Sequence, residues 1–135
     1  MRVVIDTNVI VSGILNPHGS PGRILDTLLS EAITALYDDR ILSEYHEVLL
    51  RPVFGFLRSD VEALLDFVES RGEHISAEPL SLILPDPDDL PFLEVATSGA
   101  AEALITGNAR HFKPCRGQHS VLVITPADFL RRYAK

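Results

Sequence analysis

Three acidic residues of the sequence lie where a predicted strand or helix begins or ends. Asp6 ends an apolar, β-branched run, Glu44 lies in the first turn of a predicted helix, and Asp89 begins another helix. Carboxylates held close together raise one another's pKa unless a cation lies between them. Mg²⁺ and Mn²⁺ prefer oxygen ligands and keep waters that can become nucleophiles. If the three acids converge, they suit metal-assisted hydrolysis of a phosphodiester.

Each of these residues also has an ordinary structural interpretation. Asp6 can cap the loop after its strand, and Glu44 can stabilise a helix N-terminus through its negative charge. Asp86, Asp88 and Asp89 can form a solvated turn in which Asp89 caps the next helix. No single residue decides between the interpretations. The metal site depends on the combination, and it requires three acids distant in sequence to meet in space.

The segments that must position these acids alternate between strand-like and helix-like patterns. Strands are predicted at residues 2–11, 33–37, 103–106 and 121–124, with a short edge strand at 74–76. Helices are predicted to begin at Ser20 or Gly22, at Ser43, at the Ser59–Glu62 capping box, after Asp89 and at Pro126. This alternation predicts the α/β class, as a three-layer α/β/α domain with a central, mainly parallel sheet.

The predicted topology brings polar residues to one edge of that sheet. In parallel α/β sheets, ligands bind outside the carboxyl ends of the strands. Asp6 lies at one such end, and Thr106, Gly107 and Asn108 follow another. This edge is therefore the expected position of the site.

Length and composition indicate one globular domain over residues 1–135. The formal net charge of −7 argues against binding through a large basic surface, as in many DNA-binding modules. Cys115 is the only cysteine, so neither an intrachain disulfide nor a thiolate zinc site is expected. No apolar run is long enough for a membrane span or a signal-peptide core, and we expect a cytoplasmic protein.

Four motifs in a fixed order resemble the PIN domain family, and in particular its VapC-like branch, the ribonuclease toxins of prokaryotic toxin–antitoxin systems. The motifs are Val-Ile-Asp6-Thr7-Asn8-Val-Ile, Ser43-Glu44-Tyr45, Asp86-Pro-Asp88-Asp89-Leu-Pro-Phe-Leu-Glu94-Val-Ala and Ile-Thr106-Gly107-Asn108. The ordered set is specific, whereas Asp-Thr-Asn alone is not. The resemblance implies a parallel sheet between helices and a ribonuclease that depends on Mg²⁺ or Mn²⁺.

Transferred residue by residue, the resemblance puts Asp6, Glu44 and Asp89 in the metal-binding cluster. It implies that Thr7 or Asn8 orients Asp6 or a metal-bound water. Thr106 would hydrogen-bond within the same site, and Asn108 would take part in catalysis by holding a metal-bound water.

Asn108 is a departure from the family pattern, because many PIN domains carry a fourth acidic residue there. An amide keeps an oxygen ligand but adds no negative charge, so a second metal would be held more weakly or lost. Whether Asp86 or Asp88 compensates is open, as is the choice between one and two ions. The resemblance also implies a cognate antitoxin and a homodimer, and the negative net charge would favour a basic partner.

Possible substrate contacts follow the last motif. Arg110 and Lys113 carry positive charges suited to phosphates, and Phe112 either stacks on a base or belongs to the core. His111 is expected to have a positional role. Ser12, after the first strand, either approaches the substrate or lies on an ordinary surface loop.

Two other functions compete with the nuclease. An aspartyl-nucleophile phosphatase also begins with a strand and an aspartate, but it needs a second acid two positions later, where Asn8 stands, and Lys113 is its only candidate lysine. A PIN-fold module that binds RNA or protein without catalysis is the stronger alternative, because Asn108 lowers the charge available for metal.

Overall fold

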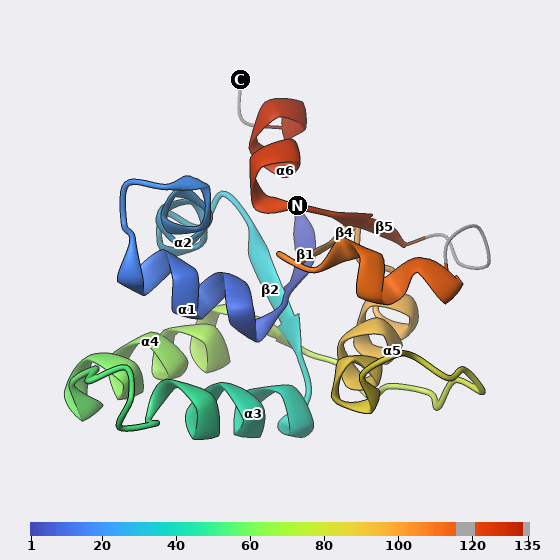
Figure 1. Cartoon of the computed structure of the whole chain (residues 1–135), viewed down its shortest axis with the longest axis horizontal. Coiled ribbons are helices and arrows are strands. Elements are labelled where there is room, and N and C mark those ends of the chain that lie inside the picture. The colour runs from blue at the N-terminus through green and yellow to red at the C-terminus, as the bar shows by residue number, and fades with distance from the viewer. Residues whose placement is uncertain (116–120, 134–135) are drawn as a thin grey trace.

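The computed structural model describes residues 1–115 and 121–133, with side chains described as far as Phe112 in the first range. Its helices and strands alternate along the chain (Figure 1). The strands are β1 (Arg2–Ile5), β2 (Thr34–Tyr37), β3 (Glu73–His74), β4 (Ala103–Ile105) and β5 (Leu122–Ile124). The helices are α1 (Thr7–Leu15), α2 (Ser20–Leu29), α3 (Asp39–Leu49), α4 (Arg58–Arg71), α5 (Leu90–Ser98) and α6 (Pro126–Tyr133), with 3₁₀ helices η1 (Pro87–Asp89) and η2 (Ala109–Cys115).

The strands form one parallel sheet in the order β3-β2-β1-β4-β5. Because β1 is central, its residues Val3, Val4 and Ile5 are buried on both faces. Helices α1 to α4 gather on one side of the sheet, and α5 packs against β1, β2 and β4 on the other (Figure 1). The three-layer α/β/α prediction is therefore confirmed, and none of the helices in the described ranges is long and apolar enough to cross a membrane.

The prediction of one strand over residues 2–11 is wrong at its second half. β1 ends at Ile5, Asp6 occupies the N-cap position, and α1 begins at Thr7. The β-branched residues Val9, Ile10 and Val11 resemble a strand, but helical periodicity buries only the first two. The signal for a helix was present, since Asp, Thr and Asn are favoured at helix N-termini.

Two predicted helix starts are also displaced. α3 begins at Asp39 because the Asp38 side chain accepts a hydrogen bond from the Ile41 N–H, so Glu44 lies in its second turn and not its first. α4 begins at Arg58 without a side-chain cap, and the Ser59–Glu62 capping box does not form. The first shift changes the role available to Glu44, because a mid-helix carboxylate does not serve the helix N-terminus.

Candidate functional site

The site begins where β1 and β4 end side by side. The Thr106 hydroxyl, fully buried after β4, donates to Asp6 Oδ2 at 2.7 Å, and the Asp6 N–H donates to the Ile105 carbonyl at 2.9 Å. The Asp6 side chain is only 5% exposed. The parallel register of the two strands thus fixes one carboxylate at the carboxyl edge of the sheet.

Asn8 joins the start of α1 to the segment after β4. Its amide nitrogen donates to Asp6 Oδ2 at 3.2 Å, and its amide oxygen accepts from the Gly107 N–H at 3.1 Å. The Asn108 N–H in turn donates to the Thr106 hydroxyl at 3.0 Å. Two of these bonds restrain the Asp6 carboxylate through the same oxygen, Oδ2, and the network connects it to Asn108.

Glu44 reaches the same edge from α3. The Thr7 hydroxyl donates a hydrogen bond to Glu44 Oε2, and the Tyr45 hydroxyl donates to the Ile5 carbonyl at the end of β1. Tyr45 is buried, so this second bond attaches α3 to the central strand immediately before Asp6. Neighbouring residues of α3 therefore hold Glu44 at a fixed position relative to Asp6.

Asp89 approaches from the junction of η1 and α5. Its side chain makes no capping bond to α5, so the structure does not support the interpretation of Asp89 as a helix cap. Its nearest basic partner is His111, whose Nδ1 lies 3.6 Å from Asp89 Oδ2. Asp86 is the residue that caps, because it accepts from the Asp88 N–H at 3.0 Å.

These groups line a single cleft of about 370 Å³, which we call the acidic cleft. Its lining contains Asp6, Glu44 and Asp89 together with Asp86, Asp88, Thr7, Asn8, Ser12, Asn108 and His111. A second hollow of about 390 Å³ shares Asn8, Ser12 and Asn108 with it. Residues predicted from four separate motifs thus face one space.

Burial raises the pKa of each principal carboxyl group in the acidic cleft. Desolvation is the main cause for Asp6, and for Glu44 it is reinforced by the charge of Asp6. The pKa of Asp89 rises to about 6 through desolvation and the charges of Asp6 and Asp86. The folded protein therefore concentrates negative charge that a cation would stabilise.

The donor set suits a hard divalent cation, because its ligands would be carboxylate and amide oxygens. Across the described residues, however, no three His, Cys, Asp or Glu side chains are arranged as a group that could hold a metal ion. Thr7 and Thr106 instead hydrogen-bond to Glu44 and Asp6. The donor chemistry of the cleft fits Mg²⁺ or Mn²⁺, although the described side chains do not already form a three-residue metal-binding group.

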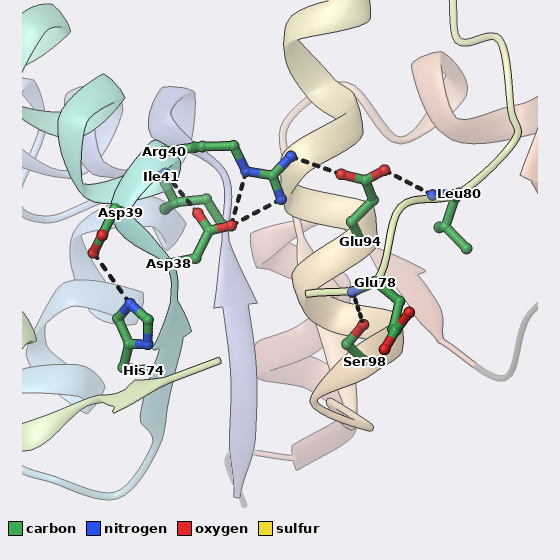
Figure 2. Close-up of polar contacts among 9 residues, drawn as sticks. All are labelled: Asp38, Asp39, Arg40, Ile41, His74, Glu78, Leu80, Glu94 and Ser98. Carbon is green, nitrogen blue, oxygen red and sulfur yellow. Dashed lines mark hydrogen bonds and ion pairs between the residues drawn. The ribbon is translucent and has the colours of Figure 1, made fainter. Parts of the chain in front are cut away.

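An ion-pair bridge joins α3, which carries Glu44, to α5, which follows Asp89 (Figure 2). The Arg40 guanidinium in α3 contacts Asp38 at 2.8 Å and Glu94 of α5 at 2.7 Å. Glu94 is only 5% exposed, and its other oxygen accepts from the Leu80 N–H at 2.8 Å. This Asp38–Arg40–Glu94 bridge therefore fixes α3 against α5 and against the segment leading to η1.

Replacing Arg40 with Ala is expected to lower the free energy of unfolding by about 2 kcal/mol, because two nearly buried carboxylates lose their partner. Arg40→Lys should recover part of the loss, since it restores charge without the forked geometry. Urea unfolding measures both, with exposed Arg23→Ala as the control. Equal stability of wild type and Arg40→Ala would contradict a stabilising bridge.

The residues predicted to contact the substrate differ in their position relative to the acidic cleft. Ser12 and His111 line the acidic cleft, whereas Arg110 is exposed outside its described lining. The Lys113 side chain lies outside the described residues. Phe112 is fully buried, so of its two interpretations the structure supports the core and not base stacking.

Sequence reasoning missed Arg51 and Phe54, which also line the acidic cleft. They follow α3 in a segment that has no match to a chemical motif. No local spacing marks them, because both residues lie beyond the end of α3 at Leu49, where helical periodicity no longer applies.

Comparisons with known proteins agree with this geometry. A family model described as PIN domain matches residues 2–110. An uncharacterized protein of Methanocaldococcus jannaschii is 30% identical over 146 residues, covering 100% of this chain and 93% of that protein. A chain in the crystal structure of VapBC2 from Rickettsia felis bound to a DNA fragment from their promoter is 25% identical, with a TM-score of 0.58 and coverage of 93% of this chain and 98% of that chain. The protein therefore belongs to the PIN domain family and is VapC-like.

Proposed function

We propose that this protein is a divalent-metal-dependent endoribonuclease and the toxin of a toxin–antitoxin pair. PIN domains are generally nucleases, which supports hydrolase activity at the level of the family. The observation that carries the finer proposal is the convergence of Asp6, Glu44 and Asp89 on one cleft, with the pKa of each raised. Such a cleft attracts a cation and, through it, a phosphodiester.

In this proposal Asp6, Glu44 and Asp89 hold Mg²⁺ or Mn²⁺. When bound, the ion supplies positive charge to the scissile phosphate and lowers the pKa of an attacking water. Thr106 and Asn8 keep the Asp6 carboxylate oriented through their hydrogen bonds. Thr7 restrains Glu44 in the same manner. Asn108 lies at the exposed end of this network and offers an amide oxygen to a bound water.

The partners of the proposal are an RNA substrate, a cognate antitoxin and a second copy of the chain, in the cytoplasm. The VapBC2 structure to which the chain is similar is a complex bound to DNA, which supports an antitoxin partner. The net charge of −7 would favour a basic segment on that partner. Ser12 and His111 line the acidic cleft, and in this proposal they contact the RNA.

A non-catalytic PIN-fold module is the second candidate. Two observations favour it: the amide of Asn108 contributes no charge, and within the described part of the chain the carboxylates are not arranged as a metal-binding group. A phosphatase has less support, because Asn8 bonds to Asp6 and Gly107 through an amide that cannot act as a general acid.

The test separates cleavage from binding on one RNA. Purified protein is incubated with end-labelled single-stranded RNA in Mn²⁺, in Mg²⁺ or in EDTA, and products are resolved by electrophoresis while binding is followed by anisotropy. The proposal expects internal cleavage with either metal and none in EDTA. Binding without cleavage under all three conditions would identify the module instead and refute the enzyme.

A further inference from the structure

The acidic cleft continues along α3, away from the sheet edge. Glu44 and Val48 lie one helical turn apart and both line it, and Arg51 lines it immediately beyond the helix. The Arg51 N–H bonds to the Val48 carbonyl at 3.2 Å, which continues the turn. Two turns of helix rise roughly 10 Å, so the backbone of Arg51 lies about that far along the cleft from the backbone of Glu44.

Arg51 is the only lysine or arginine in the described lining of the acidic cleft. Its guanidinium pairs with Glu47 at 2.8 Å, but the two side chains are 50% and 61% exposed. An exposed pair at this spacing contributes little to stability. The guanidinium is therefore available to exchange Glu47 for a stronger anion such as a phosphate, which it can bind through two N–H groups.

Phe54 lines the cleft next to Arg51 and lies parallel to Phe56, with ring centroids 5.4 Å apart and an interplanar angle of 12°. The intervening Gly55 has φ +67°, a conformation that favours glycine. Hydrogen bonds from the Phe54 N–H to the Arg51 carbonyl and from the Gly55 N–H to the Pro52 carbonyl define the turn. The aromatic pair is thus held by backbone geometry.

Phe54 and Phe56 differ in what they pack against. Phe56 packs against the hydrophobic core, whereas Phe54 is not among the described residues that do so. Phe54 is therefore a partly buried aromatic ring that is supported by a second ring and lines the cleft. The part of the ring that remains accessible faces the cleft and offers a surface for stacking.

We propose that Arg51 and Phe54 form a nucleotide subsite, in which Arg51 binds a backbone phosphate and Phe54 stacks on a base next to the cleaved bond. This inference rests on the proposed nuclease function and names its substrate class as single-stranded RNA, because only an unpaired base can stack on a protein ring. A nucleic acid is favoured over a protein ligand because the subsite is continuous with the acidic cleft, and because a cation beside an aromatic ring is the usual arrangement for single strands.

The subsite predicts separate effects on long and short substrates. In Mn²⁺, the efficiency of RNA cleavage relative to hydrolysis of bis(p-nitrophenyl) phosphate should fall about tenfold in Arg51→Ala and in Phe54→Ala, mainly through a higher KM for RNA. Phe54→Trp, which keeps an aromatic face, should keep the wild-type ratio of RNA cleavage to hydrolysis of the small substrate. Glu47→Gln should lower the KM for RNA, because it releases Arg51 and removes a negative charge.

Matched controls lie in the same segment. Arg58→Ala removes an equal charge from an exposed arginine of α4 outside the described lining, and Val53→Ala shortens a side chain that is 82% exposed. Neither should alter the ratio. Circular dichroism checks that each variant is folded, and Phe54→Leu keeps an apolar side chain without an aromatic face.

Failure of the inference differs from failure of the proposed function. If the wild type cleaves RNA with metal and both Ala variants keep its KM, the subsite is refuted while the nuclease remains. The same holds if Phe54→Leu matches the wild type, since stacking would then have no role. If the wild type hydrolyses neither substrate, the proposed function fails first, and RNA affinity unchanged in Arg51→Ala would refute the subsite as well.

Discussion

Replacing Asp6 with Asn is expected to lower RNA cleavage by more than about 100-fold, because losing even a residue that only supports a metal ligand costs about 10- to 100-fold. Asparagine keeps the shape of the side chain, and its amide oxygen can still accept from Thr106. It removes the charge that would attract a cation. The free energy of unfolding should stay equal or increase, since desolvation raises the pKa of the native carboxyl group.

Steady-state cleavage assays and thermal unfolding of the same preparations measure these two effects. Asp26→Asn is the matched control, because Asp26 is an exposed acid of α2 that does not line the acidic cleft. A cleavage rate in Asp6→Asn close to that of Asp26→Asn would exclude Asp6 from the metal site. A large loss of stability would assign it to the fold instead.

Stability should also depend on pH through Asp89. Its native pKa is about 6, against 3.8 for the ordinary group, so between these values the folded state binds more protons than the unfolded state. The free energy of unfolding then decreases as pH rises through this window. Full conversion of the pKa difference gives about 3 kcal/mol, and solvent screening of this partly exposed carboxyl group reduces it to about 2 kcal/mol. The stabilisation is fully lost above the native pKa. The raised pKa values of Asp6 and Glu44 act in the same direction.

Urea unfolding of wild type and Asp89→Asn between pH 4 and pH 8 measures the contribution of Asp89 together with its coupling to Asp6 and Asp86, because groups outside the acidic cleft titrate equally in both proteins. The variant should be more stable than the wild type at pH 8 and similar to it at pH 4, and it should cleave RNA poorly. Mn²⁺ at about 100 times its dissociation constant should add about 2.7 kcal/mol to the wild type at pH 8, where the carboxylates are charged. A constant difference between the proteins at all pH values would contradict the assignment.

The fold could be predicted from the sequence because strand and helix patterns alternate with few interruptions. The ends of elements were harder to predict. Val9, Ile10 and Val11 have strand propensity, and tertiary packing in α1 overrides it. Asp38, and not the predicted Ser43, caps α3, because the Asp38 carboxylate accepts a hydrogen bond from the Ile41 N–H before the chain reaches Ser43. Which of two nearby residues caps the helix depends on where the preceding strand ends. The composition of the segment does not reveal that position.

The candidate site could likewise be predicted only in part. Asp6 and Thr106 could be placed together because both end strands of one parallel sheet, and the structure joins them by a hydrogen bond. Arg40, Arg51 and Phe54 could not be identified, because their roles depend on which helix packs beside them and not on local spacing. Phe112 was ambiguous in the sequence, since core and ligand-contacting aromatics have the same composition, and only its burial resolved the choice.

The central position of β1 has a consequence for synthesis of the protein. β1 is synthesised about a hundred residues before β4, one of its two neighbours in the sheet, and the Thr106–Asp6 bond joins residues 100 positions apart. A nascent chain released before β4 therefore lacks half of the edge that orients Asp6. Chains that end before β4 should therefore lack an ordered acidic cleft, and with it the activity proposed for the complete fold.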